Sequence, residues 1–155
     1  MTVPTAARVV RIRRYLDAPP ERVFTAWTDP NVLARWISPV GHAVVSIDPR
    51  PGGRLQVTMV GEGRQIEHVG EYREIIPNRR LVFTWQSSYT GPDPSVVTIE
   101  LESRDGGTEL TLVHAALPHD AVDSHAGGWS QILHRLAAVL TGASPANSHQ
   151  GESIS

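Results

Sequence analysis

Residues 17–36 read DAPPERVFTAWTDPNVLARW, and this stretch predicts two short helices separated by a break. Proline is favoured in the first turn of a helix, so we expect a helix over Pro20–Thr28. Asp29 is a good N-cap and Pro30 a good first-turn residue, so a second short helix starts there. The apolar residues that would face inward from these helices are Val23, Phe24, Trp27, Leu33, Trp36 and Ile37.

Segments with strand-like alternation flank this stretch on both sides. A strand is predicted upstream, over Arg8–Leu16. Downstream, apolar residues recur with a period of two between turn signals such as Pro51-Gly52-Gly53. The six downstream segments cover residues 43–47, 55–59, 64–76, 81–87, 97–101 and 110–114. Short turns and this alternation are typical of an antiparallel meander with one face in water.

The long segment Arg64–Ile76 decides which side chains face inward. Its odd positions hold three charged residues, so we place the even positions inside. The even positions are Ile66, His68, Gly70, Tyr72, Glu74 and Ile76. On this interpretation Gly70 would let the helix or a ligand approach the strand closely.

The C-terminal part of the chain predicts one long helix. Asp123 or Ser124 can cap it, and it should run to about Leu140. Its apolar stripe at helical spacing is Trp129, Ile132, Leu133, Leu136 and Leu140. Such a stripe needs a partner, and the inner face of the sheet is what remains. We therefore predict an α+β fold in which a curved antiparallel sheet of about seven strands surrounds this helix.

Composition sets limits on function. The chain has 155 residues, a formal net charge of -2 and no cysteine, so disulfides and thiolate chemistry are excluded. The near-neutral charge gives no reason to expect nucleic-acid binding, and no segment is suited to membrane insertion. The seven histidines show no metal-binding spacing, and we expect no cofactor. We expect a cytoplasmic protein with flexible ends at residues 1–7 and 141–155.

Four stretches, in this order, resemble a known family. They are DAPPERVFTAWTDPNVLARW (17–36), DPRPGGRLQVTM (48–59), GEYREIIPNRRLVFTW (70–85) and HAGGWSQILHRL (125–136). They are similar to the START-like (Bet v 1-like, SRPBCC) superfamily, in the branch of the C-terminal domain of the activator of Hsp90 ATPase. The resemblance covers about residues 8–140 and implies a helix-grip fold. It also implies a small hydrophobic ligand in a cavity between the sheet and the last helix.

Side chains that the alternation turns inward are the candidates for that cavity. The candidate ligand-binding residues are Trp36, Met59, His68, Tyr72, Phe83, Trp85, His114, His125 and Trp129. Aromatic walls with a few polar tips are typical of small-molecule pockets. The small residues Ala126-Gly127-Gly128 would leave space rather than fill it. For Trp36, Phe83 and Trp129 a plain core position is the competing interpretation, because burying aromatic rings is itself strongly stabilising.

Three functions remain open at this stage. The first is non-enzymatic binding of a small hydrophobic or aromatic molecule. The second is an enzyme similar to polyketide cyclases or dehydratases, with acid–base groups drawn from His68, Tyr72, Glu74 and His114. Two of these groups within hydrogen-bonding distance of each other would favour catalysis. The third is a chaperone-cofactor-like interaction module, and the sequence also leaves a homodimer open.

Overall fold

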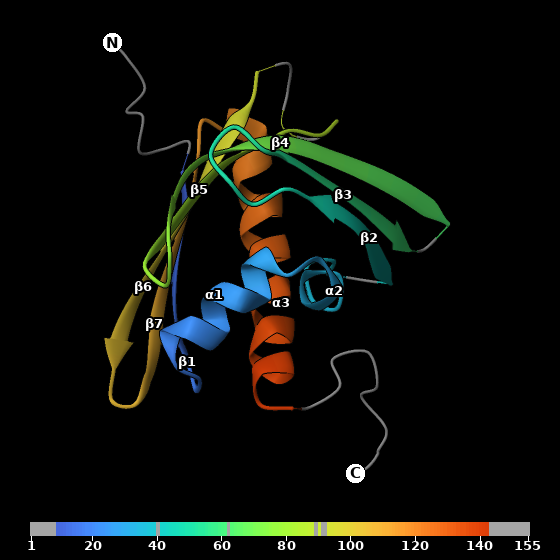
Figure 1. Ribbon diagram of the computed structural model, residues 1–155. Helices are drawn as coiled ribbons and strands as arrows, with labels where there is room; N and C mark the ends of the chain where they lie inside the picture. The colour runs from blue at the N-terminus through green and yellow to red at the C-terminus, as the bar shows by residue number, and fades with distance from the viewer. Residues whose placement is uncertain (1–8, 40, 62, 89, 91–92, 143–155) are drawn as a thin grey trace.

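The inner face of a curved sheet surrounds the C-terminal helix α3 (Figure 1). The computed structural model describes residues 9–39, 41–61, 63–88, 90 and 93–142. The elements are β1 Val10–Leu16, α1 Pro20–Thr28, α2 Pro30–Leu33, β2 His42–Ile47, β3 Arg54–Gly61, β4 Arg64–Ile76, β5 Arg80–Trp85, β6 Ser95–Arg104, β7 Gly107–Ala115, the 3-10 helix η2 His119–Ala121 and α3 Val122–Leu140. The predicted α+β helix-grip fold is confirmed.

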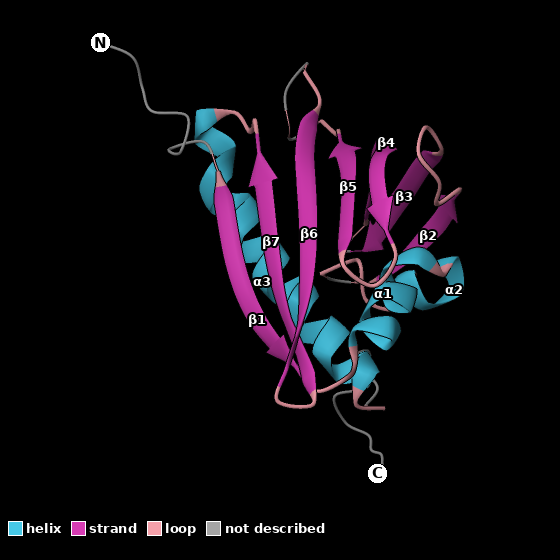
Figure 2. Cartoon of the chain, turned by 60° about the vertical axis from the view of Figure 1, so that its left-hand side comes forward, coloured by secondary structure: helices cyan, strands magenta, loops and turns pink. Residues whose placement is uncertain are grey.

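The described residues form one seven-stranded antiparallel sheet in the order β1-β7-β6-β5-β4-β3-β2. Figure 2 shows the sheet with α3 behind it and with α1 and α2 beside its lower part. The apolar stripe of α3 is buried against the sheet, as its spacing predicted. Of the flexible ends predicted at residues 1–7 and 141–155, residues 1–7 and 143–155 lie outside the described residues.

The two short helices begin where the prolines and the aspartate predicted. Pro20 occupies the first turn of α1, and the Asp29 carboxylate accepts from the backbone N–H groups of Asn31 (2.9 Å) and Val32 (3.4 Å). Trp27 and Trp36 meet edge to face at 4.6 Å, one from α1 and one from the segment after α2. The two helices therefore carry an aromatic pair into the space between sheet and α3.

A β-bulge in β4 corrects the predicted set of inward residues. The pairing with β5 shifts register between Tyr72 and Glu74, so the alternation reverses beyond that point. Glu74 is exposed and pairs with Arg80, and Ile76 is 41% exposed, whereas Ile75 packs against the core. The prediction that Glu74 and Ile76 face inward is wrong, because an inserted residue inverts a period-two pattern.

Gly70 also has a different role from the one we expected. A Cβ atom at Gly70 would lie 1.8 Å from the carbonyl oxygen of Thr84 in β5. The close approach is therefore between two neighbouring strands just before the bulge. Neither the helix nor a ligand is the neighbour that requires glycine here.

The start of α3 differs from the predicted cap. The N-cap is Ala121, the last residue of η2, and its side chain makes no capping bond. Ser124 instead lies in the first turn, where its hydroxyl donates to the Ala121 carbonyl (3.1 Å). The preceding 3-10 turn replaces a side-chain cap, and the sequence pattern of Asp123 and Ser124 does not reveal it.

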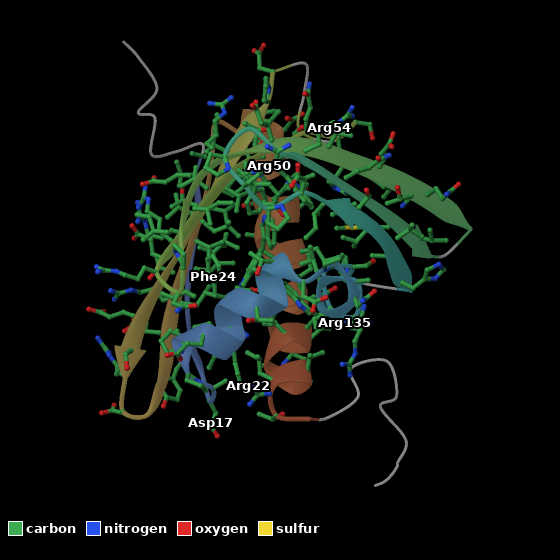
Figure 3. The ribbon with its side chains drawn as sticks, viewed as in Figure 1. Asp17, Arg22, Phe24, Arg50, Arg54 and Arg135 are labelled. Atoms are coloured by element: carbon green, nitrogen blue, oxygen red, sulfur yellow. The ribbon has the colours of Figure 1, made fainter. Side chains whose placement is uncertain are left out.

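Two arginines connect α3 to the segment that holds α1 and α2 (Figure 3). Arg22 in α1 donates to the carbonyl of Leu140, the last residue of α3, at 2.7 Å. Arg135 in α3 donates to the carbonyl of Ser38, which follows α2. These bonds hold the C-terminal half of α3 against the short helices. The N-terminal half lies against the other end of the sheet, where the candidate site is found.

Candidate functional site

A cavity of about 320 Å³ lies between the N-terminal half of α3 and strands β3, β4 and β5. Its walls are mainly apolar. The residues that line it are Pro39, Met59, Arg64, Ile66, His68, Trp85, Ser124, His125, Gly128, Trp129 and Ile132. This volume falls at the lower end of the range for small-molecule sites, which is roughly 300–1,000 Å³.

Aromatic rings from the sheet and the helix form one wall of the cavity. The imidazole of His68 stacks on the indole of Trp85, with ring centroids 4.4 Å apart and planes 26° apart. The Trp85 and Trp129 rings lie 5.7 Å apart and are tilted by 45°. His68 and Trp85 are brought together because an isolated bridge pairs Val69 with Gln86, which sets β4 and β5 side by side at this level. The result is a continuous aromatic surface facing the cavity.

Glycine in α3 leaves the cavity unfilled. Gly128 lines it, and a Cβ atom built at Gly128 would meet no atom within 4 Å. A larger residue there would project into the space that faces Trp85. Gly127 also has open space around its Cβ position, but it is exposed to solvent and does not line the cavity. The missing side chain of Gly128 is therefore a direct source of cavity volume.

His68 is a buried polar group in this aromatic wall. Its Nδ1 atom has no hydrogen-bond partner among the described residues. Burial, followed by the nearby charge of His125, lowers the pKa of His68 to about 4. The imidazole is therefore neutral at pH 7.

His114 has both ring nitrogens committed. Trp129 Nε1–H donates to its Nδ1 (2.9 Å), and an indole nitrogen can only donate, so Nδ1 carries a lone pair. The proton of the neutral ring then sits on Nε2 and is donated to the Ser95 hydroxyl (2.7 Å), which in turn donates to the Trp85 carbonyl. Burial, followed by the charges of His125 and His68, lowers the pKa of His114 to about 3. This histidine orients Trp129 and has no free nitrogen for proton transfer.

His125 has the opposite arrangement of its ring nitrogens, with the proton on Nδ1. Its Nδ1 atom lies 2.9 Å from the Ala121 carbonyl, and a carbonyl only accepts, so Nδ1 carries the proton. In the neutral ring Nε2 is then an acceptor, and it has no partner among the residues that the structure describes. His125 lines the cavity, and its ring meets that of His114 edge to face at 5.2 Å.

The structure divides the nine candidate ligand-binding residues into two groups. Met59, His68, Trp85, His125 and Trp129 line the cavity. The other four are buried elsewhere, namely Trp36, Tyr72, Phe83 and His114. An inward-facing side chain therefore does not always line the cavity, because some inward-facing residues belong to the packed core.

The four residues outside the cavity contribute to the core. Trp36 donates its indole N–H to the Ala26 carbonyl (3.1 Å). Tyr72 and Phe83 contact each other and line only a void of about 10 Å³. Burial, with a smaller contribution from the Asp48 carboxylate, raises the pKa of Tyr72, so its phenol stays protonated. These aromatic residues pack against one another and do not face the cavity.

Several cavity residues were not among the candidates. Ile66 and Ile132 were predicted to face inward but were not singled out, and Gly128 was noted only as a small residue. Pro39, Arg64 and Ser124 were missed altogether. A signal for Ser124 exists, since it precedes His125 and lies four residues before Gly128, on the same side of the helix.

The acid–base candidates do not form a pair. Among the described residues, no hydrogen bond joins any two of His68, Tyr72, Glu74 and His114. Glu74 lies at the surface with Arg80 as its partner. Similarly, no group of three or more His, Cys, Asp or Glu side chains in the described part of the chain is arranged to hold a metal ion.

Another hollow, of about 560 Å³, lies among charged side chains of β1, β5, β6 and β7. Its charges largely pair with one another: Arg13 lies 3.4 Å from Glu109, and Arg80 contacts Glu100. An apolar molecule would gain little there, because it would cover charged groups that interact with water. The cavity beside α3 is the better candidate.

Comparison with known proteins identifies the family. A sequence profile described as "Activator of Hsp90 ATPase homolog 1-like protein" matches residues 17–141. The chain belongs to this family. It is thus a member of the START-like (Bet v 1-like) superfamily, in the branch that the four sequence stretches indicated. A search among curated proteins finds no significant match.

Solved structures of similar proteins agree with this placement in the activator of Hsp90 ATPase homolog 1-like family. The protein CV1439 from Chromobacterium violaceum is 32% identical, with a TM-score of 0.76 over 86% of this chain and 96% of that chain. CalU16 from Micromonospora echinospora is 28% identical, with a TM-score of 0.68 over 86% of this chain and 76% of that chain. A protein from Arthrobacter aurescens, 20% identical, shares the fold with a TM-score of 0.79 over 96% of this chain and 95% of that chain. Within the described residues, no helix is long and apolar enough to cross a membrane.

Proposed function

We propose that this protein binds a small, mainly apolar molecule in the cavity between α3 and strands β3, β4 and β5. The observation that carries the proposal is the unfilled volume of about 320 Å³ behind an aromatic wall. Small-molecule sites are typically concave, mainly apolar pockets with a few polar groups, and this pocket has that composition. Members of the START-like superfamily commonly bind hydrophobic ligands, which supports the same conclusion.

The wall chemistry favours apolar ligands. Trp85 and Trp129 offer broad ring surfaces, and Met59 and Ile132 add flexible and branched aliphatic groups. A ligand that covers these groups removes apolar surface from water on both sides of the contact. The free energy gained is about 25 cal/mol per Å² of apolar surface buried.

Binding is favoured over catalysis by the state of the histidines. His114 uses both ring nitrogens in structural hydrogen bonds, and Tyr72 lies in the packed core. Of the four acid–base candidates only His68 lines the cavity, which His125 also lines, and no hydrogen bond joins His68 to another candidate among the described residues. A general acid–base reaction needs two positioned groups or a stabiliser for the charge that develops.

The experiment compares two substitutions one residue apart on α3. Gly128→Leu places a side chain inside the cavity, and Gly127→Leu places the same side chain on the solvent face. Both remove a helix-interior glycine, so both should raise helix stability by about 0.5–1 kcal/mol. The pair therefore separates loss of cavity volume from a change in helix stability.

A panel of small aromatic and aliphatic compounds is screened by thermal shift and by quenching of tryptophan fluorescence. A ligand at a hundred times its Kd stabilises the fold by about 2.7 kcal/mol, which raises Tm by roughly 5–10 °C. We expect such shifts for wild type and Gly127→Leu, and their loss in Gly128→Leu. The proposal fails if no compound binds wild type, or if Gly128→Leu binds as well as Gly127→Leu.

A further inference from the structure

Two imidazoles line the cavity. His68 comes from β4 and His125 from the first turns of α3, and both line the same hollow. The two rings are close enough for the charge of one to affect the other. Each has a nitrogen without a hydrogen-bond partner among the described residues, namely Nδ1 of His68 and Nε2 of His125.

Beyond the histidines the described lining is mainly apolar, apart from Arg64 at the start of β4. Ile132 lies seven residues after His125 on α3, so about 10 Å of helix rise separates the two positions. Met59 and Ile66, which are directly paired across β3 and β4, line the cavity on the sheet side. The hollow therefore suits a molecule with one polar group at one end and an apolar remainder.

The acceptor on His125 selects the kind of polar group. Its Nδ1–H is held by the Ala121 carbonyl, so the neutral ring presents a lone pair at Nε2. The hydroxyl of Ser124, which also lines the cavity, already donates to the same carbonyl. A ligand that donates a hydrogen bond satisfies the acceptor on His125, whereas a pure acceptor does not.

Charge selects against an anionic ligand. A carboxylate in an apolar hollow needs a buried cation as its partner. The lining cation is Arg64, which is exposed at the start of β4 and already has another interaction. His68 is uncharged at pH 7, because burial depresses its pKa. No buried fixed positive charge among the described lining residues is available to hold a carboxylate.

We propose that the ligand is a neutral aromatic alcohol whose hydroxyl donates to Nε2 of His125 and whose ring packs on Trp85 and Trp129. This inference rests on the proposed function and names the class of molecule that the same cavity takes. The imidazole of His68, which stacks on Trp85, also lines the cavity.

The test uses three probes of nearly equal shape: 2-naphthol, 2-methylnaphthalene and 2-naphthoate. The methyl compound has no hydrogen-bond donor and leaves water more readily, so hydrophobicity alone would make it the tighter ligand. We expect wild type to bind the naphthol about tenfold more tightly than the hydrocarbon, with the carboxylate weakest. Affinities are measured at pH 7 by quenching of tryptophan fluorescence.

Two variants assign the preference to the imidazole. His125→Phe keeps an aromatic ring but removes the acceptor, and we expect the naphthol and the hydrocarbon to bind it about equally. His134→Phe changes an exposed histidine of the same helix outside the cavity, and the preference should persist. Circular dichroism and the binding of the hydrocarbon itself show whether each variant keeps its fold and its cavity.

The outcomes separate the two proposals. If no probe binds wild type, the proposed function fails and this inference fails with it. If the hydrocarbon binds as tightly as the naphthol, the cavity is confirmed but the hydroxyl assignment is overturned. If the carboxylate binds most tightly, or if His125→Phe keeps the preference for the naphthol, recognition depends on a different group and the inference is likewise overturned.

Discussion

Lowering the pH from 7 to 5 should destabilise this protein strongly, because two histidines are buried in the neutral form. Burial is the main cause that lowers the pKa of His68 to about 4 and that of His114 to about 3. In the unfolded chain both rings take up a proton near pH 6.5. Between pH 6.5 and the folded pKa values, the unfolded state therefore binds more protons, and stability falls as the pH falls.

The size of the effect at pH 5 follows from the unfolded pKa. At that pH both rings are still largely neutral in the folded protein. The exact value of each lowered pKa therefore has little influence on the free energy of unfolding. Each histidine lowers the free energy of unfolding by about 1.36 kcal/mol per pH unit. Over the roughly 1.5 pH units between 6.5 and 5, this amounts to about 2 kcal/mol. The two together remove about 4 kcal/mol, a large fraction of the stability of a typical domain, which is about 5–15 kcal/mol. The effect is absent above pH 7 and levels off below the folded pKa values.

Urea unfolding followed by tryptophan fluorescence measures this loss at pH 7, 6 and 5. His68→Phe keeps a ring against Trp85 and removes one titrating group, so its loss should be about 2 kcal/mol instead of about 4. Met59→Leu, a volume-conserving change in the same cavity wall, should keep the full loss. The reasoning is refuted if wild type is equally stable at pH 7 and pH 5, or if His68→Phe loses as much as wild type.

Three further substitutions test individual contacts by the same unfolding assay. Gly70→Ala should cost about 2–4 kcal/mol, because its Cβ would collide with the Thr84 carbonyl oxygen; an unchanged midpoint would contradict the close strand contact. Ser95→Ala should cost about 1–3 kcal/mol, because it leaves the buried Nε2–H of His114 without an acceptor; a neutral effect would contradict the assigned tautomer. Asp29→Ala should cost about 1 kcal/mol through loss of the α2 cap, and Asp29→Asn should restore most of it.

Local chemistry made most of the fold predictable. Pro20, Asp29 and Pro30 determine the two short helices, since each residue has a specific preference at the start of a helix. The period-two segments gave all six downstream strands, because antiparallel strands with one wet face alternate strictly. The bulge after Tyr72 escaped this reasoning. An inserted residue is specified by the pairing with β5, and the strand's own sequence does not show it.

Alternation alone could not separate the cavity from the core, because both lie on the same inner face of the sheet. Tyr72 and Phe83 face inward as His68 and Trp85 do. Trp27 of α1 packs near Phe83, however, with ring centroids 6.3 Å apart.

The short helices thus fill one half of the concave face with aromatic rings. Over the other half α3 presents Gly128, and the space opposite Trp85 stays empty. The site therefore arises from a mismatch in side-chain volume between two parts of the chain that cover one sheet. Such a mismatch depends on which helix lies over which strand, so the three-dimensional arrangement is needed to find it.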